Sequence, residues 1–341
     1  MLFWHELKKT LLAPAIIGFA LLCIGLNIFI VIANDYAYQY VEREGEPYNI
    51  FLGYDAGATA DYYVRLYRMT GRAEENTRAK YAKLQTVIDE KAAKGDALSL
   101  YFGRGSYYMH EFLFQKLLFA FIAQAALMAL FAALMQTGFE NIRNTEQLVC
   151  SSTVGRRIVW TKLAAALTTG LIFFCAILAI SLCLFFIRYD YSAVWHDNVS
   201  SSFNVNVFQA PFITWHSFSV AGYLWAIIGA AAGLTLVFGL FGYAIGTFFR
   251  SGYAACGITV ALCVLQYLAL LRSHVGSGVR GVLNLTPLML WQNSGKSGWF
   301  TDGGAEIIWA HFETIGLIAC FVTLAAVSAI AASSYKRRDL L

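Results

Sequence analysis

Six long apolar segments constrain this chain more than any other feature of its sequence. The hydrocarbon core of a membrane is about 30 Å thick, so a helix needs roughly 20 apolar residues to cross it. Buried strands of a soluble sheet would give apolar runs of only about four to eight residues. The sequence therefore predicts an all-α integral membrane protein with six transmembrane helices. The six predicted spans are Leu11–Asn34, Leu117–Phe139, Leu163–Ile187, Phe218–Phe249, Gly252–Leu271 and Ile307–Ala332.

Composition excludes a soluble or nucleic-acid-binding chain. Hydrophobic residues make up 58% of the sequence and charged residues only 13%, whereas soluble domains carry about 25% charged residues. Such a chain needs membrane lipids to cover much of its surface. The net charge of +4 is small and the basic residues are dispersed, unlike the basic stripe of a nucleic-acid binder. The first apolar segment is too long for a signal peptide and no small-residue cleavage site follows it.

The basic residues of the short loops predict the orientation, because such residues favour the cytoplasmic side. One set of loops carries ten bases against four acids, and the opposite set carries four bases against three acids. Both termini are therefore expected in the cytoplasm, with the long segment 35–116 outside. The ten bases are Lys8, Lys9, Arg143, Arg156, Arg157, Lys162, Arg250, Lys336, Arg337 and Arg338.

Three regions follow from this topology. Residues 1–34 combine a short interfacial helix, rich in aromatic and basic residues, with the first span, in whose first turn Pro14 fits well; a frayed terminus is the alternative. Residues 35–116 form an external domain in which Ala73–Lys94 is predicted to be a helix. Its many tyrosines suit a packed cap, a membrane-interface belt or a substrate surface. Residues 117–341 hold spans two to six.

Two features of the third region concern packing. The fourth span contains two pairs of glycines spaced by three residues, Gly229 with Gly233 and Gly242 with Gly246. Such small residues let helix backbones approach closely in lipid, either within one chain or at the seam of a dimer. The stretch Ser273–Gly304 is too irregular to span, and we expect an external hairpin that dips into the outer leaflet.

Motifs for chemistry within the chain are missing. Gly295-Lys296-Ser297 resembles the end of a phosphate-binding loop, but Leu290 stands where that motif needs glycine. The sequence has no zinc-protease pattern or nucleophile elbow, and its cysteines lack metal-site spacing. Glu306, His311 and Glu313 are expected at the outer end of the last span, within reach of water, which argues against a proton relay. The chain is therefore predicted not to be an enzyme and to hold no metal or cofactor.

The main cytoplasmic feature is an elbow at residues 140–162. Asn144 or Thr145 can cap a short helix there, Leu148 and Val149 give it an apolar patch, and Lys162 is expected at the headgroups. A short helix of this kind between two spans suits the groove of a soluble partner. The residues expected to make this contact are Glu140, Asn144, Thr145, Glu146, Gln147, Leu148, Val149, Arg156 and Arg157.

The elbow resembles the corresponding loop of permeases of the type-2 ABC transporter family. It departs from the family pattern at Asn144, where glycine is common, and it lacks the proline before the arginines. The resemblance extends to Glu6-Leu-Lys-Lys with Pro14, to Leu285-Thr-Pro-Leu and to the ending Tyr335–Leu340. The matching elbow residues are Glu140, Thr145, Leu148, Ser152, Arg156 and Lys162.

The resemblance implies a permease subunit of an ATP-driven exporter in a bacterial plasma membrane. The elbow would be the coupling helix that docks on an ATPase, with two ATPase subunits carrying the ATP and Mg, and a second permease chain would complete a dimer, expected to be a homodimer. An amphipathic peptide or lipid-like substrate is expected, as in Gram-positive exporters of antimicrobial peptides or phenol-soluble modulins. The alternatives are a non-transporting permease in peptide sensing or immunity and an exporter of sodium, lipid or glycan. A membrane enzyme and an ion-coupled carrier are weaker alternatives.

Overall fold

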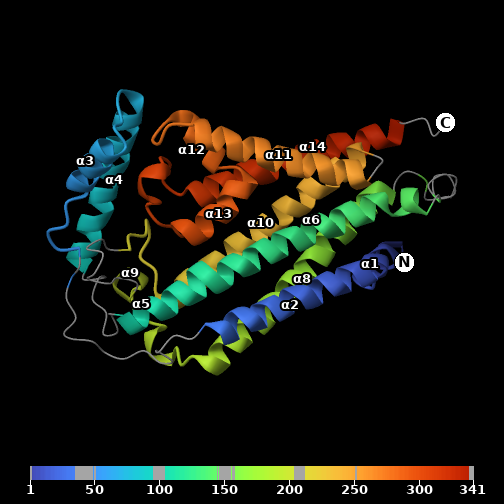
Figure 1. Cartoon of the computed structure of the whole chain (residues 1–341), viewed down its shortest axis with the longest axis horizontal. Coiled ribbons are helices and arrows are strands. Elements are labelled where there is room, and N and C mark those ends of the chain that lie inside the picture. The colour runs from blue at the N-terminus through green and yellow to red at the C-terminus, as the bar shows by residue number, and fades with distance from the viewer. Residues whose placement is uncertain are drawn as a thin grey trace.

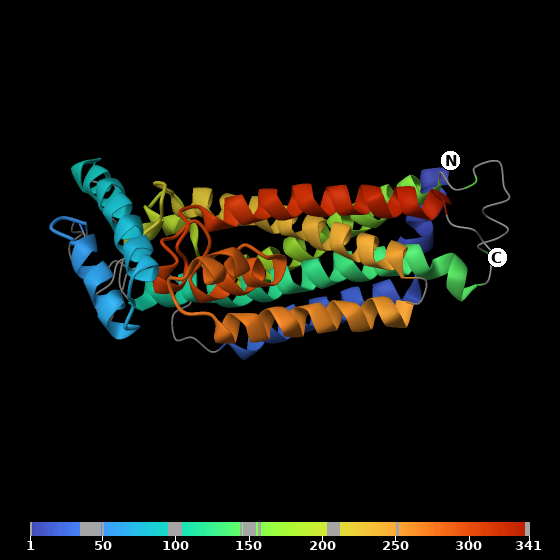
Figure 2. The same ribbon diagram turned by 90° about the horizontal axis from the view of Figure 1, so that it is seen from above.

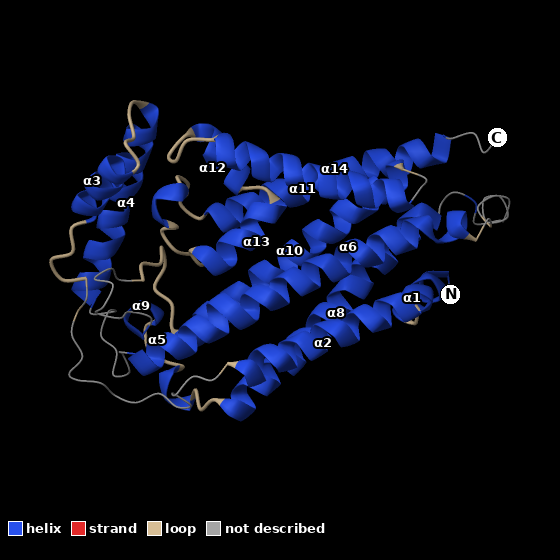
Figure 3. Cartoon of the chain, viewed as in Figure 1, coloured by secondary structure: helices blue, strands red, loops and turns tan. Residues whose placement is uncertain are grey.

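The structure is a computed structural model that describes residues 2–34, 49, 51–94, 104–143, 145, 155, 158–202, 212–249 and 252–337. Over these residues the chain is helical and forms no strand. Two isolated antiparallel β-bridges are present in the described residues, one between Asn198 and Ser219 and one between Thr214 and Thr301. Long helices run lengthwise in one elongated bundle, and two further helices lie across one of its ends (Figures 1 and 3).

Six of the described helices are long and apolar enough to cross a membrane, which is the architecture of a multi-pass membrane protein. Each overlaps one predicted span, so the predictions of an all-helical fold and of six spans are confirmed. The six are α2 (Pro14–Ala33), α6 (Leu118–Ile142) with the turns before it, α8 (Ile158–Arg188), α10 (Val220–Phe248), α11 (Gly252–Arg272) and α14 (Phe312–Arg337).

The second long helix begins earlier than the sequence predicts. It starts as α5 (Arg104–His110), continues through a π-helical segment η1 (Glu111–Leu117) and enters α6 without a break. Polar and aromatic residues interrupt the apolar run here, so apolar length alone does not predict these helical turns. Tertiary packing stabilises them, because Phe112 and Leu113 lie fully inside the bundle.

The predicted N-terminal helix is present as α1 (Leu2–Leu11), and Pro14 occupies the first turn of α2 as expected. α1 packs against α8 and α6. α1 lies at the same end of the bundle as the last turns of α14 (Figure 1). We call this the terminal end of the bundle and the opposite one, which carries α3 and α4, the cap end.

The centre of the bundle is the pair α6 and α10, onto which α8 and α14 pack (Figure 2). α2 lies against α8 and α6, whereas α11 stands at the edge and buries the smallest share of its length. A chain of buried amides and a hydroxyl joins three helices. Asn27 Nδ2 donates to Gln124 Oε1 at 2.9 Å and to Ser181 Oγ at 2.7 Å. All three side chains are buried, so their polar atoms find partners within the protein.

Of the four glycines of α10 that the sequence predicts to pack closely, two lie against α6. A Cβ added at Gly242 would stand 2.8 Å from the carbonyl oxygen of Leu130, and one at Gly246 would collide with Thr137. A Cβ at Gly233 would touch Leu317 of α14 at an ordinary 3.7 Å, and one at Gly229 would meet nothing within 4 Å. The close approach of α10 therefore lies at the half of the helix nearer the terminal end.

The domain at the cap end consists of α3 (Ala56–Leu66) and α4 (Arg72–Lys94), which pack on each other. The prediction of a helix over Ala73–Lys94 is confirmed. Tyr81 is buried in a small core with Leu84 and Trp215, whereas Tyr62 is more than half exposed. Part of the tyrosine set therefore packs the cap, and part remains on its surface.

Buried lysines of α4 fasten the cap to the loops of the bundle. Lys80 Nζ donates to the backbone carbonyl oxygens of Asp302 at 2.9 Å, Gly304 at 2.5 Å and Ile307 at 2.9 Å. Lys91 Nζ donates to Thr214 Oγ1 at 2.8 Å. Burial lowers the pKa of Lys80 from 10.5 to about 8, although the charge of Asp302 acts in the opposite direction.

The stretch before the last span contains two short helices, α12 (Gly278–Asn284) and α13 (Pro287–Lys296). α13 packs against α6, α10 and α14, and α12 contacts α11. His311 has a left-handed φ of 55°. The last long helix therefore begins at Phe312 instead of the predicted Ile307.

We predict opposite results for alanine at two glycines of α10. Gly242→Ala should lower the free energy of unfolding by about 1–3 kcal/mol, because the new methyl group overpacks the contact with α6. Gly229→Ala should not lower it, since its Cβ enters open space and alanine favours a helix. Denaturation of the detergent-solubilised protein followed by circular dichroism measures both. Equal stability of the two variants would contradict the packing described here.

We also predict a pH dependence that belongs to Lys80. Between about pH 8 and 10.5 the unfolded chain keeps the proton that the folded chain has released, so stability rises with pH. Over this range the free energy of unfolding gains roughly 3 kcal/mol. This gain is lost again as the pH falls through about 8. Tyr63, whose pKa burial raises to about 12, acts only above pH 10. The melting temperature between pH 7.5 and 9.5, compared for wild type and Lys80→Met, isolates this part. A Lys80→Met curve parallel to wild type would exclude it.

Candidate functional site

The predicted coupling elbow connects α6 to α8 at the terminal end of the bundle. Of the predicted contact residues, Glu140 and Thr145 lie within the described part, and the backbone N–H of Thr145 donates to the carbonyl oxygen of Glu140 at 2.9 Å. The other seven lie outside the described residues: Asn144, Glu146, Gln147, Leu148, Val149, Arg156 and Arg157. The structure therefore characterises the base of the elbow.

Glu140 is the centre of this base. It lies on the last turns of α6, is only 6% exposed, and accepts a hydrogen bond from Lys162 of α8. Its other carboxylate oxygen accepts from Lys9 of α1, with the Nζ and Oε1 atoms 3.0 Å apart. One carboxylate thus joins α6 to α8 and to α1, which lies far from both in sequence.

A second carboxylate completes the cluster. Glu6 of α1 is paired with Lys9 at 2.6 Å and accepts from Gln136 Nε2 of α6 at 2.6 Å. Gln136 in turn accepts from the hydroxyl of Thr10. We call this set the charged junction; it consists of Glu6, Lys9, Thr10, Gln136, Glu140 and Lys162.

The electrostatics of the charged junction are balanced, because it holds two carboxylates and two ammonium groups. A buried charge without a partner is strongly destabilising. Every one of these charges has an opposite partner within 3.0 Å. Lys9 also lies over the ring of Phe139, 4.3 Å from its centroid. The arrangement therefore fixes α1, α6 and α8 to one another at the point where the elbow leaves the bundle.

The burial of Lys162 differs from the sequence-based expectation. The sequence predicts this lysine at the headgroups, but it is 6% exposed and bonded to Glu140. Glu6, Lys9 and Gln136 were not predicted as site residues. Only the spacing of three residues between Glu6 and Lys9 on one helix gave a local signal. The contact of Lys9 with Glu140 spans 131 residues, so no local pattern reveals it.

The position of Glu313 also differs from the sequence-based expectation. The sequence places it within reach of water, yet its side chain is 0% exposed at the start of α14. Thr314 donates to its Oε1 at 3.2 Å, and Oε2 has no partner among the described residues. His311 lies nearby in sequence, with its ring stacked on His216 at 4.8 Å between centroids. In the described part of the chain, no cluster of three or more His, Cys, Asp or Glu residues could hold a metal ion.

No protein-family model matches the chain, and none of the curated proteins compared with it matches either. The architecture of six membrane-crossing helices and the charged junction are therefore the observations on which a functional proposal has to rest.

We predict that the charged junction is sensitive to the loss of one charge and tolerant of the loss of a pair. Glu140→Gln leaves Lys162 without its partner carboxylate and should lower the free energy of unfolding by about 3–5 kcal/mol. The double variant Glu140→Leu with Lys162→Met removes both charges and should recover most of that loss. Thermal unfolding in detergent measures the three proteins.

The control is Glu74→Gln, which removes one of the two carboxylate partners of Arg78 on the exposed surface of α4 and leaves Asp61. Stability should hardly change there, because exposed ion pairs contribute little. If Glu140→Gln and Glu74→Gln had equal effects, the charged junction would not be the buried network described above.

Proposed function

We propose that the chain is the permease subunit of a type-2 ABC exporter, driven by separate ATPase subunits. The observation that carries the proposal is the position of the charged junction at the base of the elbow that joins α6 to α8. The resemblance of the elbow to the family's coupling segment supports the same interpretation.

The charged junction suits the transmission of movement. A displacement of the elbow shifts Glu140 and with it the two helices that Glu140 holds, α1 through Lys9 and α8 through Lys162. Coupling requires two states with different contacts. In the proposed mechanism, closure of two ATPases around ATP and Mg pulls on 144–149 and tilts this rigid group of helix ends. The ends of α1, α6 and α8 then move together relative to the other helices.

The proposed assembly contains two copies of this chain and two ATPase subunits in a bacterial plasma membrane. Both termini and the elbow face the cytoplasm, and the cap faces outward. Away from the charged junction, a hydrogen-bonded set of uncharged side chains, Asn27, Gln124 and Ser181, joins α2, α6 and α8. A pathway beside such helices suits an amphipathic peptide or lipid-like substrate better than a free ion.

The first test is co-purification. Extraction of the full chain from its native membrane under mild conditions should bring a nucleotide-hydrolysing protein with it. Consistent absence of ATPase activity from the purified complex would exclude the proposal.

The second test is a charge-reversing double variant of the elbow, Glu146→Lys with Leu148→Asp. Stimulation of the ATPase by substrate should fall to the basal level, because the variant removes the apolar contact and reverses a charge. Membrane insertion and the melting temperature should stay unchanged. The matched control is Leu66→Asp with Glu75→Lys on the exposed surface of the cap, which should retain stimulation. Full stimulation in the elbow variant would contradict its role in coupling.

A further inference from the structure

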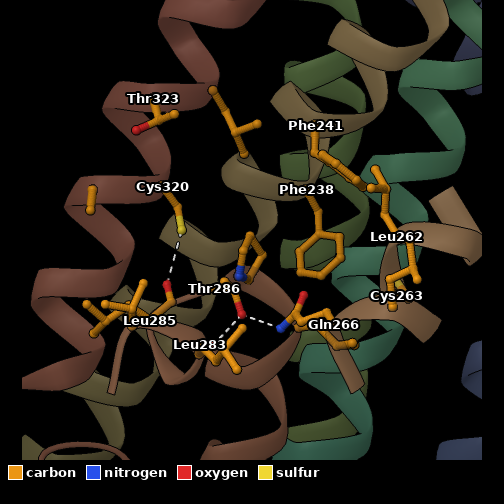
Figure 4. A pocket seen from close by; sticks show the side chains of 16 residues that line it. Phe238, Phe241, Leu262, Cys263, Gln266, Leu283, Leu285, Thr286, Cys320 and Thr323 are labelled. Carbon is orange, nitrogen blue, oxygen red and sulfur yellow. Dashed lines mark hydrogen bonds between the residues drawn. The ribbon is translucent and has the colours of Figure 1, made fainter. Parts of the chain in front are cut away.

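Two cavities follow one another along α11, on the side that faces α12 and α13. The larger has a volume of about 680 Å³ and lies between α10, α11, α14 and the turn that links α12 to α13 (Figure 4). Its walls are apolar, with Phe238, Leu262, Leu283 and Leu324 among the lining residues.

Three of the polar side chains of this larger cavity, Gln266, Thr286 and Cys320, are bonded to protein atoms. Gln266 donates to the hydroxyl of Thr286, which itself donates to the carbonyl oxygen of Leu283 at 2.5 Å. Cys320 Sγ donates to the carbonyl oxygen of Leu285 at 3.2 Å (Figure 4). The cavity therefore favours hydrocarbon as its occupant, because its bonded polar groups need no ligand.

The smaller cavity has a volume of about 190 Å³ and a charged lining. Arg280 and Lys296 both contact Glu306, at 3.3 Å and 2.8 Å respectively. Burial pushes the pKa of Glu306 up, but the two cations outweigh it and the pKa lies below its usual value. Glu306 therefore remains ionised, and the cavity carries one net positive charge.

Two residues that line this cavity carry a hydrogen-bond donor without a partner among the described residues. Arg280 Nε and Asn293 Nδ2 are buried and unbonded among the described residues, and Asn293 is only 5% exposed. Both residues line the smaller cavity. A buried donor without a partner is unfavourable, so a ligand with several acceptor oxygens would remove this cost.

The order of the two cavities matches the depth profile of a lipid. The charged cavity touches Tyr267, Leu270 and Leu271 in the last turns of α11, and the apolar cavity touches Leu262 and Cys263 farther from that end. The step from Cys263 to Leu270 is about 10 Å along a helix. Charged groups thus lie at the end of a membrane-crossing helix, and an apolar cleft lies deeper along the same helix.

We propose that this double cavity binds one anionic phospholipid, with its phosphate at Arg280 and Asn293 and an acyl chain between α11 and α14. The net positive charge favours an anionic headgroup, because a choline group would place a second cation beside Lys296. The turn between α12 and α13 separates headgroup from chain. The site does not depend on the proposed function.

The test counts lipids on the purified full chain by native mass spectrometry in detergent. Phosphatidylglycerol and phosphatidylcholine with the same acyl chains are titrated in parallel, together with dihexanoyl phosphatidylglycerol and inorganic phosphate. We expect one molecule of the long-chain anionic lipid to bind first, about tenfold more tightly than phosphatidylcholine. The short-chain lipid and phosphate should bind much more weakly, because neither fills the apolar cavity.

Two variants probe the two cavities separately. Arg280→Gln should weaken phosphatidylglycerol binding about tenfold, which corresponds to one charge-assisted hydrogen bond. Ala319→Phe should block the apolar cavity from an exposed position of α14 and prevent binding without touching the charged groups. The control is Arg272→Gln, an exposed cation at the end of α11 that lines neither cavity, and it should leave binding unchanged.

Circular dichroism establishes that each variant is folded. Equal loss with Arg272→Gln and Arg280→Gln would overturn the proposal in favour of general charge attraction at the membrane surface. Binding of inorganic phosphate as tight as that of the lipid would overturn it in favour of a simple anion site. Unchanged lipid binding in folded Ala319→Phe would overturn the assignment of the acyl chain.

Discussion

The packing of α10 on α6 is the contact on which the rest of this bundle depends. Helices in lipid gain little from excluding water and associate through close packing and polar contacts. Gly242 and Gly246 allow α10 to reach the backbone of α6 near Leu130 and Thr137. α8 and α14 then pack on this pair, and α13 fits among α6, α10 and α14. Polar contacts add specificity at two levels, with Asn27, Gln124 and Ser181 inside the bundle and the charged junction at one end.

Apolar length and caps were sufficient to predict much of this fold. The six spans and the helix at Arg72–Lys94 follow from runs of residues that act through their own neighbours in sequence. The early start of the second helix was missed because residues from Tyr107 to Lys116 mix polar and aromatic side chains, and tertiary packing decides their state. Local sequence patterns therefore predict that a helix exists, whereas its first residue can depend on tertiary packing.

Pairings between distant residues could not be predicted in the same way. Lys162 and Glu313 have the character of side chains at a water-facing boundary, yet both are buried. The partner of Lys162 lies on the preceding long helix, and that of Lys9 lies 131 residues away. Their contacts depend on how helix ends are placed in space. Among the glycines, spacing alone does not separate Gly242, which meets α6, from Gly229, which faces open space.

The two ends of the bundle hold their buried charges in different ways. At the terminal end, carboxylates and lysines meet each other directly. At the cap end, Lys80 of α4 is surrounded by three backbone carbonyl oxygens of the loop before α14. The cap is thus fastened by main-chain geometry, whereas the helix ends near the elbow are fastened by matched side-chain charges.

The balance of charge within the charged junction restricts which substitutions can be tolerated there during evolution. A replacement at Glu140 leaves an ammonium group stranded away from water, so it survives only beside a second replacement at Lys9 or Lys162. Divergent descendants are therefore expected to alter these positions as sets, exchanging or losing acid and base together. Such correlated substitutions in α1, α6 and α8 would reveal, from a set of related sequences, a contact that a single sequence does not show.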